Sequence, residues 1–542
     1  MHALLFIVIA FILYWLAYKF YATYLSEKIW NLDPNRQTPS YKYEDGFEFV
    51  PTRTDVVFGH HFVSVTGAAP IIGPITAAIW GWFPALIWIV LGTILFGAVH
   101  DLGSLVTSLR HDGRGLADYL NDLLGPIATR LMYLVAFFLL VLVGAVFIHV
   151  IAVLLEAFPQ GVYSIWAEIP LALIIGILLR KKYKINIYLA SIIAVAIMYF
   201  LIWVGTLYPV EIGYWPWVVI LLVYMFAAGR LPVWALVQPR DFINGIQLVL
   251  ALVLSSVGII ALSFMGEATL AAPAVRIAPE GAPPIWPFVM VVIACGAISG
   301  FHSLVASGTT PKQLQNEKDA KAVGYGAMVT EGYLAVIALL TAVVGLGVAG
   351  YQEWYPAWGV AAWPVVFPEG GGAFLAAIGI PVVFGTTFFA IVLKSFAMTT
   401  LDSCMRLTRI CFAEGADRFK MGRVCQERTV SMLPGFIVIA FLCFTEYQME
   451  MWPVFGAANQ ILAALALIAA AVFLKTLKKP TVSYIIPFII MIVTSMSAMG
   501  YNVITDYIPG EKWTLVIIGA IIFFAALGIV ITAYSTWTKK QE

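Results

Sequence analysis

The sequence predicts an all-α polytopic membrane protein. Hydrophobic residues make up 61% of its 542 residues and charged residues only 11%, whereas a soluble domain has roughly 45–50% apolar and about 25% charged residues. Long apolar segments recur along the chain, and a motif of Gly, His and Pro occurs in two of them. The net charge of +1 comes without a basic tract, so nothing indicates nucleic-acid binding.

Fifteen apolar segments are candidate transmembrane helices. A helix needs about 20 apolar residues to cross a bilayer. The first segment lacks a basic start and a small-residue cleavage site, so we expect a retained helix and not a signal peptide. The segments 166–180 and 214–229 are the shortest. The expected spans are 2–24, 56–80, 84–108, 131–156, 166–180, 185–208, 214–229, 244–266, 286–308, 325–350, 374–401, 429–446, 453–475, 482–500 and 513–535.

Lysine and arginine predict the orientation of these spans. Cytoplasmic loops are enriched in both residues, and basic loops alternate along the chain with loops nearly free of them. We therefore expect a multi-pass protein of the cell (inner) membrane, with its N-terminus outside and its C-terminus in the cytoplasm. The basic loops hold Arg110 to Arg130, Arg180 to Lys184, Arg230 and Arg240, Lys312 to Lys321, Arg406 to Arg428, and Lys475 to Lys479.

Polar stretches are expected to lie outside the lipid. The loop 25–57 is predicted to lie at the cytoplasmic surface, and 267–285 and 351–373 are predicted to be external caps or gates. No shift in composition marks a separate soluble domain. Residues 1–542 are therefore expected to form a single integral membrane domain.

The pattern Gly-x-His-x-x-x-x-[Ser/Thr]-Gly-x-x-Pro occurs twice with identical spacing, at 59–70 and 300–311. Gly and Pro interrupt the backbone hydrogen bonds of a membrane helix, and paired interrupted helices point to the binding site of a transporter. The predicted orientation makes the two copies antiparallel, as an inverted repeat requires. We expect repeat regions at 56–266 and 286–475, and C-terminal peripheral helices at 476–542.

Residues at the two interruptions are the candidates for substrate binding. Amides exposed at the start of a half-helix suit an anionic group, and exposed carbonyls suit a cation. Alternatively, Gly and Pro serve close helix packing there. Asn459 and Gln460, a polar pair in a later span, either bind substrate or join helices. The predicted substrate-binding residues are Thr66, Gly67, Ala68, Ala69, Ser307, Gly308, Thr309, Thr310 and Asn459.

Histidines next to the interruptions are candidate proton carriers, because imidazole titrates near physiological pH. These residues are His60, His61 and His302. Hydrogen bonding between helices is the alternative role. A metal site formed with His100 is conceivable, but the spacing matches no known ligand pattern, so we expect no metal and no cofactor.

Ionisable residues within spans are costly and usually face a cavity. The acids lie toward the cytoplasmic ends of their spans, where capping or snorkelling is the alternative. The deeper Lys394 ammonium either takes the place of a bound sodium ion or pairs with an acid. Nearby threonine hydroxyls are of the kind that an alkali-ion site uses. The coupling candidates are Asp101, Glu331, Lys394, Thr399, Thr400 and Asp402.

Motifs of other functional classes are missing from the sequence. No G-x-x-x-x-G-K-[ST] stretch occurs, which argues against ATP-driven pumping. No order of Ser, His and Asp recommends an intramembrane hydrolase. The five cysteines show no C-x-x-C spacing, so neither a disulfide framework nor a zinc site is implied. We expect no enzymatic activity.

Several stretches that together span nearly the whole chain resemble the carbon starvation protein family of bacterial and archaeal carriers. They are NLDPNRQTP (31–39), DGFEFVPT (45–52), VFGHHFVSVTGAAPIIGP (57–74), GAVHDLGSLVTSLRHDGRGL (97–116), LPVWALVQPRDF (231–242), ACGAISGFHSLVASGTTPK (294–312), VGYGAMVTEGYLA (323–335), TTLDS (399–403) and WPVFGAANQILA (452–463).

The resemblance implies secondary uptake of small carboxylate nutrients, with members associated with pyruvate and with short peptides. It also implies a likeness to the amino acid/polyamine/organocation carriers, whose core is two inverted five-helix repeats with broken first helices. The second motif-bearing span follows the first by seven spans here, against five in that core. The chain is shorter than the long members, and Lys394 departs from the family pattern; a buried amine favours a proton, or no ion, over sodium.

The sequence therefore predicts a secondary active transporter that imports pyruvate or a short peptide by alternating access, coupled to protons. The broken helices would hold the carboxylate. His61, His302, Asp101 or Glu331 would carry the proton. The alternative is a gradient-independent channel or a membrane nutrient receptor. The expected partners are the small-molecule substrate, the proton and the lipid bilayer, and no oligomeric state is predicted.

Overall fold

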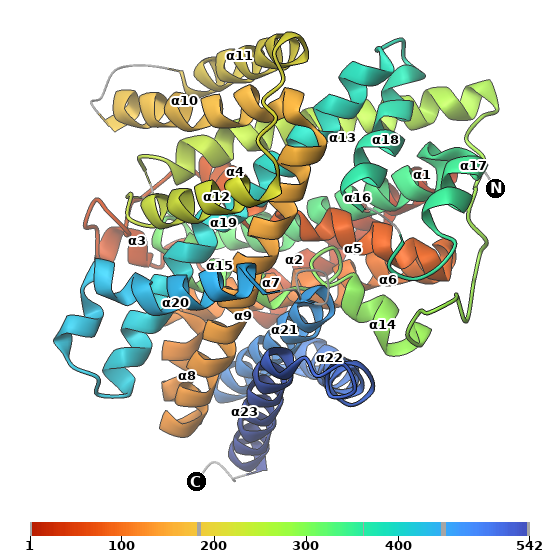
Figure 1. Cartoon of the computed structure of the whole chain (residues 1–542). Helices are drawn as coiled ribbons and strands as arrows, with labels where there is room; N and C mark the ends of the chain where they lie inside the picture. Colours follow the sequence, from red (N-terminus) through yellow and green to blue (C-terminus); the bar gives the residue numbers. More distant parts are fainter. Residues whose placement is uncertain (1–2, 181–185, 233, 361–362, 446–450, 539–542) are drawn as a thin grey trace.

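The computed structural model describes residues 3–180, 186–232, 234–360, 363–445 and 451–538. The secondary structure of these residues is helical, apart from two isolated backbone bridges, Thr52 with Leu314 and Glu280 with Ala357. Figure 1 shows the helices packed as one bundle whose members cross at varied angles. The basic residues 181–184, expected in a cytoplasmic loop, lie outside the described part.

The first third of the chain supplies nine helices. The segment from α1 continues through two π-helical stretches and α2 to Ile29, so the first span is longer than expected and the polar loop is shorter. A π-helical turn at Thr93–Gly97 joins α6 to α7. The helices are α1 Ala3–Leu16, α2 Ala22–Tyr24, α3 Pro39–Lys42, α4 Thr54–Thr66, α5 Ala69–Ala77, α6 Trp82–Gly92, α7 Ala98–Arg110, α8 Leu116–Leu124 and α9 Pro126–Ala157.

The remainder of the chain continues the bundle. The stretch 351–373, expected as an external cap, contains the end of α17 and most of α18. The helices are α10 Val162–Arg180, α11 Ile187–Leu207, α12 Tyr214–Ala228, α13 Val237–Met265, α14 Ile285–Val292, α15 Gly300–Gly308, α16 Ala327–Leu340, α17 Gly347–Trp354, α18 Trp363–Ala376, α19 Val382–Arg418, α20 Arg428–Cys443, α21 Met451–Thr476, α22 Val482–Asn502 and α23 Trp513–Thr538.

Eleven helices of the described residues are long and apolar enough to cross a membrane, or twelve if the bent pair α4 and α5 is one span. The protein is thus a multi-pass membrane protein, but the expected count of fifteen spans is not confirmed. Two expected spans are the shorter helices Tyr214–Ala228 and Arg428–Cys443. The expected span 286–308 is divided into α14 and α15 by seven non-helical residues, 293–299.

Glycine, proline and polar caps set several helix ends. Gly125, with a φ of 86°, precedes α9, and Pro126 occupies its first turn, where a missing amide hydrogen costs nothing. The Asn186 side chain accepts from the amides of Tyr188 and Leu189 at the start of α11. Gly266 ends α13 in the left-handed region. Local sequence thus fixes where these spans begin and end.

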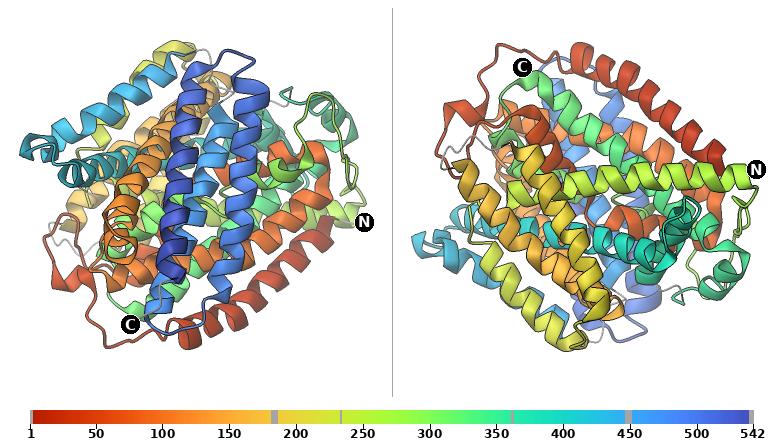
Figure 2. Two further views of the ribbon diagram at one scale, coloured as in Figure 1. Left: turned by 90° about the horizontal axis from the view of Figure 1, so that it is seen from below. Right: turned by 90° about the horizontal axis from the view of Figure 1, so that it is seen from above.

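The centre of the bundle is formed by α9, α16, α19 and α21, whose apolar residues are largely buried. α9 packs along α19, while α13 packs on α4 and α21 packs on α15, so each motif-bearing helix has one long supporting helix. α22 and α23 lie over α21 with much of their surface exposed (Figure 2). This packing places both motifs in the interior.

Residues 31–53, which we call the N-terminal strap, cover the end of the second motif. The amides of Val50 and Thr52 donate to the carbonyls of Lys312 (3.0 Å) and Gln313 (2.9 Å). Because Thr52 lies just before α4, these bonds join the start of one motif-bearing segment to the end of the other.

An ion pair anchors the strap to α19. The Glu48 carboxylate accepts from Arg406 at 2.6 Å and from Arg409 at 3.2 Å. Burial raises the pKa of Glu48, but the charges of Arg406, Lys312 and Arg409 outweigh it, so the pKa lies below its ordinary value. The strap is therefore held by a carboxylate that stays charged at neutral pH.

Candidate substrate and coupling site

The first motif forms a broken helix. α4 ends at Thr66 because Gly67 adopts a φ of 45° and a ψ of −157°, which side chains other than hydrogen disfavour. α5 begins at Ala69, and the two helices are bent by 42°. A Cβ on Gly67 would lie 2.5 Å from Thr400 Oγ1 and 3.2 Å from the Phe147 ring. Glycine thus permits both the break and its close approach to α19.

The second motif lies between two interruptions. The non-helical residues 293–299 precede α15, and Thr309 ends it, followed by the 3-10 turn Thr310–Lys312. The Thr309 amide donates to the Val305 carbonyl at 3.1 Å. The main break in this segment is therefore ahead of the motif, whereas in the first copy it lies inside the motif.

Asn459 of α21 caps the start of α15. Its Oδ1 accepts from the Phe301 amide at 2.8 Å, and its Nδ2 donates to Ser299 Oγ at 3.0 Å. An amide in the first turn of a helix lacks an intrahelical partner, so this contact stabilises the restart of the helix after 293–299. In this structure the Asn459 side chain is engaged with protein groups.

The two motif copies meet through His61. Its Nδ1 lies 2.8 Å from Thr310 Oγ1, and both residues are fully buried. The start of the first copy therefore contacts the end of the second, as expected for segments that run in opposite directions. Ser307 is held in place by donating to Ser303 O (2.6 Å) and accepting from the Leu116 amide (3.0 Å).

A buried ionisable cluster surrounds His302. Its Nδ1 lies 3.0 Å from Asp101 Oδ2, and its Nε2 lies 3.5 Å from Glu331 Oε2. His100 Nδ1 contacts the other Asp101 oxygen at 2.7 Å. These side chains come from α7, α15 and α16, and none is exposed. The structure thus brings together three predicted coupling residues, with two carboxylates that can share protons with imidazole.

A second network, around Arg240, was not predicted. Arg240 was expected in a basic loop, but it lies fully buried in α13. Its guanidinium contacts Glu168 Oε1 (2.7 Å), Asp402 Oδ2 (2.6 Å) and Tyr224 Oη (2.5 Å). Partners from α10, α12 and α19 make the burial of this cation tolerable. The predicted coupling residue Asp402 is therefore ion-paired.

His60 belongs to a third polar group. Its Nδ1 contacts the Asp241 carboxylate, to which Ser64 Oγ also donates at 3.0 Å. The adjacent Asn244 donates to Thr399 Oγ1 at 2.9 Å. This group links α4 to α13 and α19, so His60 and His61 point to different partners.

Lys394 stands apart from these acids. Its ammonium donates to the Phe158 carbonyl at 2.7 Å, just beyond the end of α9, and the side chain is fully buried. The carboxyl end of a helix attracts cations. Among the described residues, Lys394 forms no ion pair with a carboxylate, and its ammonium contacts the carbonyl and the ring of Phe158 at the end of a helix instead.

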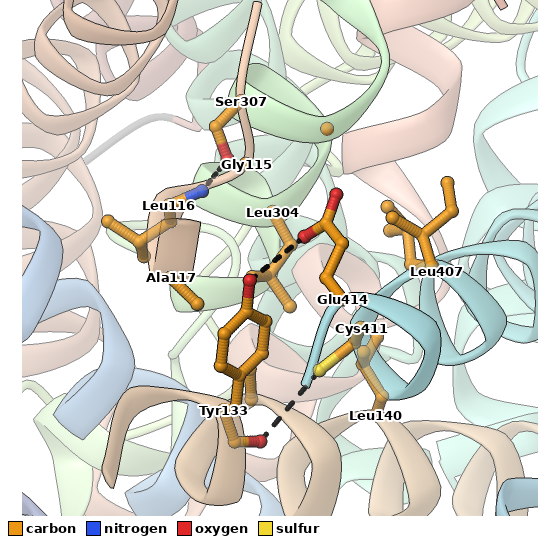
Figure 3. Close-up of a pocket in the computed structure, with 13 residues that line it drawn as sticks. Gly115, Leu116, Ala117, Tyr133, Leu140, Leu304, Ser307, Leu407, Cys411 and Glu414 are labelled. Atoms are coloured by element: carbon orange, nitrogen blue, oxygen red, sulfur yellow. Dashed lines mark hydrogen bonds between the residues drawn. The ribbon is translucent and has the colours of Figure 1, made fainter. Parts of the chain in front are cut away.

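A small cavity of about 30 Å³ adjoins the second motif (Figure 3). Ser307 and Leu304 of α15 lie on one side of it, and Tyr133 of α9 and Glu414 of α19 on the other. Tyr133 Oη donates to Glu414 Oε2 at 3.2 Å. This space is about the size that holds one water molecule.

Several functional candidates were missed by the sequence analysis. Arg240 and Asp241 lie within the stretch 231–242, which carried the family resemblance, yet the stretch was placed in a loop because it is too polar and too rich in proline to indicate a span. Glu168 and Tyr224 lie in the two shortest predicted spans. A buried charge near the start of a span leaves no periodic signal, and only its spatial partners reveal it.

The sequence of this chain is similar to a known protein family and to named proteins. A family model described as Carbon starvation protein CstA matches residues 2–354 and 363–498. A Campylobacter jejuni protein named Peptide transporter CstA is 30% identical, over 94% of this chain and 81% of its own. An Escherichia coli protein named Pyruvate/proton symporter BtsT is 29% identical, over 92% of this chain and 81% of its own. These names are those of transporters and not of enzymes.

A solved structure is also similar. MhsT in complex with L-phenylalanine superposes with a TM-score of 0.50 at 15% identity, covering 89% of this chain and 98% of that one. At this identity the likeness concerns the fold alone.

Proposed function

The chain belongs to the carbon starvation protein CstA family, and from that premise we propose that it is a secondary active transporter, which imports pyruvate or a short peptide together with protons. Its relatives are named for peptide transport in Campylobacter jejuni and for pyruvate/proton symport in Escherichia coli. Both kinds of substrate present a carboxylate. The site must therefore hold an anion and carry a proton.

We place the carboxylate at the start of α5. The amides of Ile71 and Ile72 donate to Ala68 O, so the amides of Ala68 and Ala69 precede the first helical bonds and lie at the positive end of the helix. The first copy is favoured for this role, because the Thr309 amide of the second copy is already bonded. The hydroxyls that complete the proposed site are those of Thr66, Ser307, Thr309 and Thr310.

The contact of His61 with Thr310 carries the proposal. It joins the two motif copies through an imidazole, the side-chain group whose unperturbed pKa lies closest to neutral pH. In the tautomer in which Nδ1 accepts from Thr310, protonation would turn this nitrogen into a donor and so alter the bond between the copies. The buried cluster of His302, Asp101 and Glu331 is the proposed partner in proton transfer. Coupling follows if the proton and the substrate each favour the same arrangement of the two copies.

Alternating access requires the repeats to move. We propose that 56–266 and 286–475 are the repeat regions that rock against each other, with 476–542 at the periphery, the N-terminus outside and the C-terminus in the cytoplasm. Sodium is the competing coupling ion, because the hydroxyls of Thr399 and Thr400 lie in α19 beside the first break. We prefer protons over sodium as the coupling ion because the described side chains around the motifs include titratable groups and do not form a cage of oxygen ligands.

Uptake into proteoliposomes tests the proposal. Labelled pyruvate or a labelled tripeptide should accumulate when the lumen is alkaline, and a sodium gradient alone should not replace the pH gradient. Exchange of labelled for unlabelled substrate should persist without any gradient. An uptake rate that is unchanged when the pH gradient is collapsed would refute the proton as the coupling ion. Flux of substrate without exchange would favour the alternative, a channel.

A pair of histidine variants makes the test specific. His302→Gln should abolish accumulation while leaving exchange largely intact, because it removes the titratable group and keeps a polar side chain. His149→Gln is the matched control: His149 lies in α9 and bonds Tyr214 Oη at 2.8 Å, outside the cluster. Similar losses in both variants, with normal elution in gel filtration, would argue against His302 as a coupling residue.

A further inference from the structure

A groove on the membrane-facing side of the bundle is independent of the proposed transport site. It has a volume of about 530 Å³, within the range of pockets that hold small molecules. We call it the α1–α13–α16 groove after the helices that form it. In Figure 2 (right), α1 and α13 converge near the N-terminus and diverge away from it, and α16 contacts both.

Three helical stripes line the groove. α1 contributes Phe11, Tyr14 and Trp15, and the π-helical stretch that continues it contributes Tyr18; their spacing places them on one face. α13 contributes a stripe from Val249 to Val257, and α16 contributes Val329, Thr330 and Tyr333. Phe11 is 61% exposed and Val253 53% exposed, although all three segments are long enough to span the bilayer. Hydrocarbon is therefore the solvent in contact with this groove.

Polar groups of the groove wall form hydrogen bonds within the wall itself. Ser256 and Tyr333 hydrogen-bond at 2.9 Å, and the Phe11 ring packs edge-on against the Tyr333 ring. The wall thus offers apolar surface to a ligand and no unsatisfied donor in its middle. An extended hydrocarbon chain fits this lining better than a polar metabolite does.

Two lysines mark one end of the groove. Lys321 Nζ lies over the Tyr18 ring (4.8 Å) and donates to Thr23 Oγ1, and Lys19 Nζ lies over the Trp15 ring (4.7 Å). In the part of the chain that the structure describes, neither ammonium is ion-paired with a carboxylate. Asp319, the acid nearest to Lys321 in sequence, accepts a hydrogen bond from Thr54 at the start of α4. An apolar groove therefore ends in two positive charges that lack a counter-ion.

We propose that the α1–α13–α16 groove is a binding site for an anionic phospholipid. One acyl chain lies along the three stripes, and the headgroup phosphate lies between Lys19 and Lys321. The juxtaposition matches a lipid, which is apolar along its length and negative at one end. A second copy of the chain fits less well, because a two-fold axis along the membrane normal would bring two pairs of lysines to the same depth.

Photolabelling in vesicles tests the site. The full-length protein is reconstituted in phosphatidylcholine vesicles that contain a trace of diazirine-acyl phosphatidylglycerol, or of diazirine-acyl phosphatidylcholine as the neutral probe. Cross-linked residues are mapped by mass spectrometry. We expect the anionic probe to label stripe residues of α1, α13 and α16 in preference to other lipid-exposed helices, and the neutral probe to label them less.

Variants separate the headgroup from the acyl chain. Lys19→Gln and Lys321→Gln should each lower groove labelling by the anionic probe about fivefold and leave the neutral probe unchanged. Lys420→Gln, at an exposed lysine after α19, should change neither. Val253→Trp should fill the groove and lower labelling by both probes. This substitution lies on an exposed face, so the variant is expected to fold.

Three results would overturn the site. The first is equal labelling of the groove by the two probes, which would mean that it holds bulk lipid only. The second is labelling by the anionic probe that is indifferent to both lysine substitutions. Cross-links between two copies through α1 in place of lipid labelling would assign the groove to a dimer interface and equally refute the proposal.

Discussion

Gly67→Ala tests the broken first helix directly. The backbone there has a φ of 45° and a ψ of −157°, and an added Cβ would meet Thr400 Oγ1 at 2.5 Å. Real Cβ atoms do not approach so closely, so either the break or α19 must shift. We expect a protein that still inserts in the membrane but is less stable and inactive in uptake.

The expected loss has two parts. Holding alanine in a backbone region that only glycine favours costs about 1–3 kcal/mol. Overpacking against Thr400 and Phe147 adds about 1–3 kcal/mol. Together the free energy of unfolding should fall by about 2–6 kcal/mol. The double variant Gly67→Ala with Thr400→Ala should recover the packing share only, because the backbone strain remains.

Gly59→Ala is the matched control, since Gly59 lies in the same helix and its added Cβ would lie 3.6 Å from Phe242, an ordinary contact. This variant should be as stable as the parent or better by about 0.5–1 kcal/mol, because alanine favours helix. Reversible unfolding in mixed micelles, followed by circular dichroism, measures both. If Gly67→Ala and Gly59→Ala are equally stable, the segment is not broken at Gly67 and the anion site proposed there is wrong.

Three further outcomes follow from the structure. Arg240→Met should destabilise the fold by about 3–5 kcal/mol in the same assay, since it leaves two buried carboxylates unpaired, whereas Arg53→Met at a largely exposed ion pair should cost at most about 1 kcal/mol. Glu48 has a lowered pKa, so its anchoring of the strap should be complete at neutral pH and lost as the pH falls below the ordinary glutamate value through the lower folded one; the protection of residues 45–52 against hydrogen exchange, relative to the intrinsic rate at each pH, should then fall, and Glu48→Gln should show low protection at every pH. Asn459→Ala should raise hydrogen exchange in the first turn of α15 by removing its cap, while Asn459→Asp, which keeps the acceptor, should not.

Composition and the repeated motif predicted much of the architecture. The helical class and the break at Gly67 follow from apolar length and from Gly and Pro in a span, whereas the family follows from the resemblance of the stretches quoted above. The second break was expected after Ser307 but lies mainly at 293–299, where Cys, Gly and Ser within an apolar stretch gave little sign of lost helix. The packing of Asn459 against Ser299 and Phe301 decides that break, and contacts between distant segments are not encoded in local sequence.

The sequence predicted many residues of the candidate site, but it did not predict which of them pair with one another. Asp101, Glu331 and His302 were predicted one by one, and the structure brings them together. Asp402 was also predicted, but its partner Arg240 was assigned to a loop, since a charge near the start of a span resembles an interfacial one. Which acid faces which base depends on the crossing of helices, and hydropathy does not specify it.

The bonds between the strap and residues 312–313 have a mechanical consequence. They join the chain just before the first motif to the chain just after the second motif. A shift at either end is therefore passed on directly, without a relay through the hydrocarbon core. In the rocking motion proposed above, two halves joined in this way would open and close together.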